Sequence, residues 1–181
     1  SGIEHYDRVY MSKVFSFTPD EGRIIQADEV IKGGTGYKLY GQQLAEEIEH
    51  ICPDYGLYPM FDSAYGFLTR GCINKCSFCI VPRKEGLIRK NTDILEFLDG
   101  RKKAILMDNN VIASDWGLAQ IEKIISLRIK VDFNQGIDCR IIARNKEIAA
   151  LLARVPWVRY IRMAYDNSAI TNEVETAISY L

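Results

Sequence analysis

The sequence lacks several features that would assign it to a common class of enzyme at once. It contains only two histidines, His5 and His50, and neither lies near a cysteine cluster. No Ser/His/Asp set and no carboxylate pair typical of a hydrolase can be recognised. The Lys-Ser/Thr ending of a P-loop does not follow the glycine run 33–36, and the GxGxxG spacing is missing too. We therefore interpret this run as a plain turn.

Long apolar segments and an excess of one charge are missing as well. The apolar runs are far shorter than a membrane span, and the first residues lack the basic-then-apolar order of a signal peptide. The formal net charge of -1 gives no general reason to expect nucleic acid as a partner. The basic residues between 83 and 103 are diluted by acidic ones, which favours a solvated face and supports nucleic-acid binding only weakly. We expect no membrane partner.

Cysteine is scarce and unevenly placed. There are five cysteines in 181 residues, an odd number, which argues against a disulfide framework and for a reducing compartment, the cytoplasm. Cys52 and Cys139 are isolated, and we expect both to be small core residues. The other three, Cys72, Cys76 and Cys79, lie within eight residues in the spacing CxxxCxxC.

The first 60 residues predict an incomplete α/β region. Residues 7–15 and 27–31 are rich in β-branched and aromatic side chains, which is typical of strands. Residues 39–51 carry apolar side chains at helical spacing. Proline and glycine punctuate residues 52–62, where we place a linker. The segment therefore resembles an open α/β layer that is too short for a full doubly wound domain.

Residues 61–181 alternate regularly between strand and helix patterns. Strands are predicted at 64–68, 104–107, 129–133 and 158–164. Helices are predicted at 92–98, with Asn91 or Thr92 as N-cap, and after Ser114 or Asp115, Asn145 and Ser168. Four strand–helix units in succession indicate an α/β domain with parallel strands. An exposed sheet edge after the fourth strand would be a pairing hazard, so oligomerisation is plausible.

Polar residues follow the predicted strands where each one ends. The second strand ends at Asp108-Asn109-Asn110, the third is followed by Gln135, Asp138 and Arg140, and the fourth ends at Asp166. The carboxyl ends of parallel strands form the ligand-binding rim in such architectures. Asp and Asn are also favoured in ordinary turns, so for the asparagines turn chemistry alone is at least an even alternative. Gln135 is harder to explain in that way.

The three clustered thiols match some metals better than others. A structural zinc site normally takes four protein ligands, and a redox dithiol would leave Cys72 unexplained. Three thiolates can hold three irons of a [4Fe–4S] cluster and leave the fourth iron open to an outside ligand. Zinc bound through these thiols, or a site without metal, is the alternative.

The motif Cys72-x3-Cys76-x2-Cys79, with Phe78 before the last cysteine, resembles the signature of the radical S-adenosylmethionine (SAM) superfamily. The wider string TRGC…CSFCIVPRKEG resembles the same segment in the branch of this superfamily that contains the tRNA methylthiotransferases and related proteins. The resemblance implies a [4Fe–4S] cluster held by the three cysteines, with SAM on the open iron. It implies formation of a 5′-deoxyadenosyl radical, an unknown substrate, and a one-electron donor such as a flavodoxin or ferredoxin.

The resemblance also implies roles for residues outside the motif. Phe78 takes the aromatic position next to adenine, and Asn110 falls where relatives contact the SAM amino group. Gln135, Arg140 and Asp166 fall where the SAM carboxylate or ribose can be reached. These five residues are the expected cofactor-binding set.

The implied fold is a partial parallel (β/α) barrel of about four βα units at 61–181. It is preceded at 1–60 by a remnant of a Rossmann-like α/β domain. Relatives usually have six units, so the barrel is expected to be incomplete. No Asp-x-His-x-x-Gly motif occurs, so cobalamin is not predicted. The rival expectation is a truncated, non-catalytic scaffold whose cysteine site binds zinc or is empty.

Overall fold

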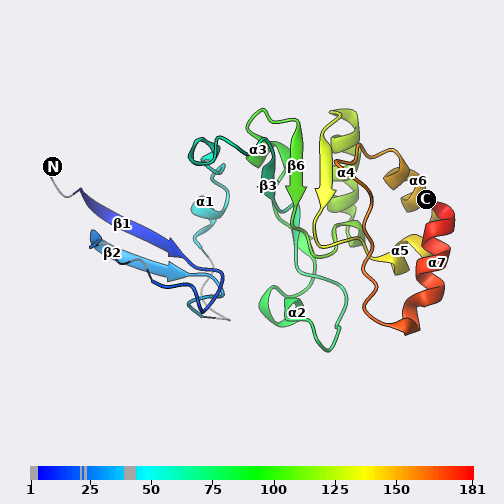
Figure 1. Cartoon of the computed structure of the whole chain (residues 1–181), viewed down its shortest axis with the longest axis horizontal. Helices are drawn as coiled ribbons and strands as arrows, with labels where there is room; N and C mark the ends of the chain where they lie inside the picture. Colours follow the sequence, from blue (N-terminus) through cyan, green and yellow to red (C-terminus); the bar gives the residue numbers. More distant parts are fainter. Residues whose placement is uncertain (1–3, 21, 23, 39–43) are drawn as a thin grey trace. The chain divides into compact units, whose positions relative to one another are not determined.

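The computed structural model describes residues 4–20, 22, 24–38 and 44–181. The chain divides into two compact units, with the division between Glu49 and His50 (Figure 1). The sequence placed the division near residue 60, after the proline- and glycine-rich segment. The two units are described separately.

The first unit contains a two-stranded parallel sheet. Strand β1, His5–Ser12, pairs with β2, Gln26–Gly33, and Arg8 opposite Glu29 forms a cross-strand ion pair of 2.6 Å. The glycine run after β2 is a turn: Gly34 has a φ of +88°, and the Gly36 N–H donates to Lys13 O at 2.8 Å. Both predicted strands are confirmed, with shifted ends.

The rest of this unit carries little regular structure among its described residues. Helix α1 spans Glu46–Glu49, much less than the predicted 39–51, of which 39–43 lie outside the described residues. Gly33 is the only buried residue among the described residues of the unit. Backbone hydrogen bonds and cross-strand pairs, rather than an apolar core, therefore hold the described part together.

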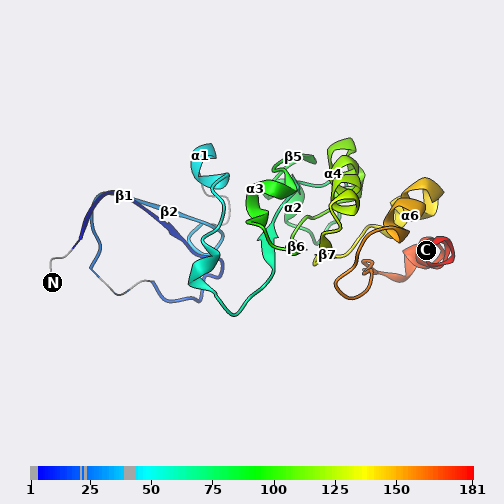
Figure 2. The same ribbon diagram turned by 90° about the horizontal axis from the view of Figure 1, so that it is seen from above.

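The second unit contains a three-stranded parallel sheet. Strands β3, Ala64–Gly66, β6, Lys103–Leu106, and β7, Lys130–Phe133, lie in the order β3-β6-β7. Helices α3, Ile94–Leu98, and α4, Asp115–Ser126, connect them, and both lie on the same side of the sheet in Figure 2. Parallel neighbours joined by crossovers of one hand produce this arrangement. The predicted parallel βαβαβ pattern is confirmed for these three strands.

The core of the second unit lies between the sheet and its helices. Leu106, Ile121, Ile124 and Val131 are fully buried from β6, α4 and β7. Three α-helices follow β7: α5, Cys139–Arg144, α6, Lys146–Ala153, and α7, Thr171–Tyr180. Burial alternates along β6 and β7, because Leu106 and Val131 face this core while Ile105 between the buried positions of β6 is only partly buried.

The predicted fourth strand at 158–164 is wrong as a continuous strand. Only two isolated parallel bridges form, Val131↔Trp157 and Ile137↔Met163. Between them the chain leaves β7 through a turn, in which Gly136 has a φ of +79° and donates its N–H to Phe133 O. This turn interrupts the edge of β7, so a continuous partner strand has no ladder to pair with.

Helix starts were predicted with mixed success. Ser114 caps α4 and Asn145 caps α6, as expected. The cap of α3 is Asp93 rather than Asn91 or Thr92, because Asp93 and Glu96 form a reciprocal capping box. Asn167 caps the short 3-10 helix Ser168–Ile170 before α7, in place of the predicted Ser168. Each wrong cap lies within two residues of the right one.

The two cysteines outside the CxxxCxxC motif differ in burial. Cys139 is buried in the core as predicted, but Cys52 is exposed, which contradicts its expected core position.

Within the described ranges, no helix combines the length and the apolar character needed to cross a membrane.

Gly117 in the first turn of α4 supplies a test of this packing. A Cβ at position 117 would lie 1.9 Å from Val111 O, a backbone atom that cannot move cheaply. We expect Gly117→Ala to lower the free energy of unfolding by about 1–3 kcal/mol or more, measured by urea denaturation. Gly22→Ala, where a Cβ meets nothing within 4 Å, is the matched control and should change it little. Equal stability of the two variants would contradict the packing.

Candidate metal and cofactor site

The cysteines lie on a loop that is closed at its base. Strand β4, Thr69–Arg70, pairs antiparallel with β5, Arg89–Lys90. The Cys72 N–H then donates to Gly86 O at 3.2 Å, just inside the loop. We call residues 71–88 the cysteine loop. Two-residue strands carry no periodicity, so this closure could not be predicted from the sequence.

The cysteine loop lies at the carboxyl end of the sheet. In Figure 1 the arrows of β6 and β7 point toward the end at which the loop and its helix α2, Val81–Lys84, are found. The turn into the loop depends on Gly71, which has a φ of +83°. A Cβ there would lie 2.3 Å from Leu87 O, so a side chain would force the two ends of the loop apart.

The three cysteines of the loop are free thiols. Cys72, Cys76 and Cys79 are all partly buried, and the Cys79 N–H donates to Cys76 O at 3.0 Å. Among the described residues, no three His, Cys, Asp or Glu side chains are gathered closely enough to hold a metal ion. The loop therefore carries the predicted ligands, but metal binding would require their sulfurs to turn toward one another.

Hydrogen-bond donors surround two of the sulfur atoms. The Asn74 N–H donates to Cys72 Sγ at 3.4 Å, and Asn110 Nδ2 donates to the same sulfur at 3.6 Å. The Arg140 guanidinium pairs first with Asp138 and also interacts with Cys76, and both contacts raise the pKa of Arg140. Donors and a cation beside sulfur stabilise thiolates and tune clusters bound through them. By ligand type this donor set fits an iron–sulfur cluster, and it fits zinc as well.

Asp138 joins three segments around these thiols. Its carboxylate accepts hydrogen bonds from Asn74 Nδ2 at 2.7 Å and Asn110 Nδ2 at 3.1 Å. It also accepts from Arg140 Nε at 2.7 Å and Nη2 at 2.9 Å. Burial alone would raise the pKa of Asp138, but the bonds from Arg140 and Asn74 hold it below its ordinary value. The network therefore links the cysteine loop to the ends of β6 and β7.

Asn110 keeps one unused hydrogen-bonding atom. Its side chain is buried, and Oδ1 has no partner within the described part of the chain. Exchanging Oδ1 and Nδ2 would turn the oxygen toward the Asp138 carboxylate, so the orientation is set by that contact. A buried carbonyl oxygen without a donor is uncommon and costs free energy. A ligand N–H would satisfy it.

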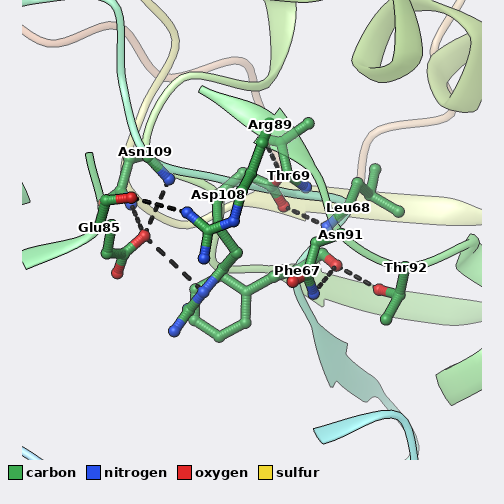
Figure 3. Close-up of polar contacts among 11 residues, drawn as sticks. Phe67, Leu68, Thr69, Glu85, Arg89, Asn91, Thr92, Asp108 and Asn109 are labelled. Carbon is green, nitrogen blue, oxygen red and sulfur yellow. Dashed lines mark hydrogen bonds and ion pairs between the residues drawn. The ribbon is translucent and has the colours of Figure 1, made fainter. Parts of the chain in front are cut away.

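Asp108 fixes the strand that leads into the cysteine loop. Its carboxylate accepts hydrogen bonds from Leu68 N at 3.1 Å and from Thr69 N and Oγ1, both at 2.6 Å (Figure 3). Burial raises the pKa of Asp108 to about 6, against the opposing effect of these donors. Asp108 thus ties β4 to the end of β6.

The predicted cofactor residues divide into two groups. Asn110 and Arg140 belong to the network around Cys72 and Cys76. Phe78 lies on the cysteine loop with its side chain 70% exposed. Gln135 and Asp166 are exposed, and within the described ranges neither takes part in the network. Asn110 and Arg140 are therefore the two that the fold brings to the thiols.

Two residues of the site were not singled out from the sequence. Asn74 links the cysteine loop to Asp138, and Glu85, near the end of the loop, accepts a hydrogen bond from Gly71 at its start. Both are single polar residues inside an irregular segment, where no periodicity or spacing marks them. Only their partners, which come from other strands, show their importance.

No family model, no curated protein and no solved structure matches this chain.

Asp108 supplies a pH test of the site. Its pKa of about 6 lies above the unfolded value of 3.8, so its stabilising contribution is complete below pH 3.8 and is lost as the pH rises toward 6. We expect the unfolding free energy of the wild type, minus that of Asp108→Asn, to fall by about 2 kcal/mol between pH 4 and pH 7. Urea denaturation across this range measures it. A difference that does not change with pH would contradict the burial of an ionisable carboxyl here.

Proposed function

We propose that this chain is a radical SAM protein, built on a partial parallel (β/α) barrel, that binds a [4Fe–4S] cluster through Cys72, Cys76 and Cys79. The observation that carries the proposal is the cysteine loop itself. It presents three free thiols at the carboxyl end of a parallel sheet, with donors to sulfur from the loop and from neighbouring segments. Three-thiolate ligation leaves one iron for SAM.

When bound, the cluster and SAM supply one-electron chemistry that generates a 5′-deoxyadenosyl radical. The chain's own residues hold and orient these groups. Asn110 Oδ1 accepts a hydrogen bond from the SAM amino group, since it is a buried acceptor without a donor in the described chain. Arg140, whose guanidinium Asp138 orients through Nε and Nη2, donates to a carboxylate.

The remaining assignments extend the same proposal. Phe78 lies beside adenine, and the exposed side chains of Gln135 and Asp166 contact the carboxylate or ribose of SAM. The protein works in the cytoplasm and receives its electron from a flavodoxin or ferredoxin. The substrate is a molecule with an abstractable hydrogen.

A second candidate is a non-catalytic scaffold whose cysteine site binds zinc or is empty. The empty form of this site is favoured by one observation: within the described residues, the thiols are not gathered into a set that could hold a metal ion. The two candidates differ in metal and sulfide content.

Anaerobic reconstitution with iron and sulfide separates the two candidates. We expect about four irons and four sulfides per chain, because three thiolates can bind three of the four irons of a [4Fe–4S] cluster. Elemental analysis and the visible spectrum measure this, and Cys72→Ala, Cys76→Ala and Cys79→Ala should each abolish the cluster. The control Cys52→Ala, at an exposed cysteine outside the loop, should retain it. One zinc per chain without sulfide would refute the cluster.

Asn110 supplies a test of SAM binding. We expect Asn110→Ala to weaken the binding of SAM to the reconstituted protein about 10-fold to 100-fold, because a hydrogen bond to a charged amino group is lost. Anaerobic equilibrium dialysis measures the affinity. The control Asn91→Ala removes an amide that donates to Phe67 O, and should leave the affinity unchanged. Wild-type affinity in Asn110→Ala at full cluster content would remove the assignment.

A further inference from the structure

Glu85 occupies an unusual place in the cysteine loop. It directly follows α2, and its side chain is only 10% exposed. Its Oε2 accepts a hydrogen bond from the Gly71 N–H at 2.9 Å and another from Asn109 Nδ2 at 3.1 Å. The same oxygen lies 3.7 Å from Arg70 Nε. Figure 3 shows the Asn109 amide, which lies after β6, directed at the Glu85 carboxylate of the loop.

The backbone of Glu85 is held as firmly as its side chain. Its N–H donates to Val81 O at 2.8 Å, and its carbonyl accepts from Arg89 Nη1 at 2.7 Å. A buried carboxylate is costly unless charges and hydrogen bonds compensate for its lost hydration. Arg70 and two N–H donors provide that compensation. A solvated glutamate at a helix end would need none of these partners.

The contacts of Glu85 converge on one cysteine. Gly71 directly precedes Cys72, and Asn109 directly precedes Asn110, whose amide donates to Cys72 Sγ. The Glu85 carboxylate therefore holds Gly71, which precedes Cys72. It also holds Asn109, which precedes the residue that donates a hydrogen bond to Cys72 Sγ.

We propose that Glu85 is a positioning residue that holds the cysteine loop against the end of β6 and so keeps Cys72 in place for the cluster. The role in cluster binding rests on the proposed function, whereas the hold on the loop does not. Glu85 acts on the cluster only through Gly71 and Asn109.

Removing Glu85 should loosen the loop without unfolding the sheet. Asp108 holds Leu68 and Thr69 independently, through three hydrogen bonds. The β4–β5 pair also has its own backbone contacts, including Asn91 N to Leu68 O at 2.9 Å. The strand before the loop therefore keeps its position when Glu85 is changed.

The experiment compares Glu85→Ala and Glu85→Gln with the control Glu96→Ala. Glu96 also bonds a backbone N–H, that of Asp93, but it lies in α3 outside the loop. In the reconstituted protein we expect Glu85→Ala to lose its cluster to a chelator about 10-fold faster than the wild type, as when a residue supporting a metal ligand is lost. Glu85→Gln, which keeps an acceptor oxygen, should restore part of this loss.

A second readout uses the apo-protein and separates this proposal from the cluster itself. We expect iodoacetamide to alkylate Cys72 several-fold faster in Glu85→Ala than in the wild type, as followed by peptide mass spectrometry. Thermal unfolding of each apo-variant shows how much stability alone has changed.

The outcomes distinguish the two proposals. If the wild type binds no cluster but Glu85→Ala exposes Cys72, the proposed function fails and the hold of Glu85 on the loop stands. If Glu85→Ala matches the wild type in both Cys72 alkylation and cluster lifetime, the positioning role is refuted. It is also refuted if Glu96→Ala, at equal thermal stability, gives the same changes.

Discussion

The Asp138 carboxylate is the contact on which the arrangement of the site depends. It accepts hydrogen bonds from Asn74 of the cysteine loop, from Asn110 after β6 and from Arg140 in α5. Arg140 is a sequence neighbour of Asp138, but Asn74 and Asn110 are far from it in the sequence and meet it where parallel strands end at the same edge of a sheet. Without this acceptor, the amide of Asn110 and the guanidinium of Arg140 would lose the partner that directs them toward the thiols.

Buried carboxylates perform the same task at two more points of the edge. Asp108 holds the strand that enters the cysteine loop, and Glu85 holds the first residue of the loop itself. Burying such groups costs free energy that hydrogen bonds and nearby cations offset. A carboxylate that is held by several donors has few alternative arrangements, so these contacts fix the positions of the segments that they join. The cysteine loop is thus irregular in backbone but closely tied to the sheet.

The regular elements were predictable to the extent that their signals were local. The apolar run at 104–107 marked the position of β6, but burial alternates along the strand: Ala104 and Leu106 are buried and Ile105 is only partly buried. Ser114 and Asn145 cap helices through their own side chains, so their role is visible in the sequence. The strand predicted at 158–164 failed because its partner edge is interrupted by the turn at Gly136, which lies more than twenty residues earlier.

The sequence by itself determined the three clustered thiols, their spacing, and the parallel order of strands that places them at the carboxyl edge of the sheet. These are properties of residue type and of near neighbours. Only the tertiary structure decided which polar residues reach the thiols: it brought in Asn110 and Arg140, added Asn74 and Glu85, and left Gln135 and Asp166 exposed. The reason is that hydrogen bonds between strand ends depend on where each loop turns back, which no local pattern records.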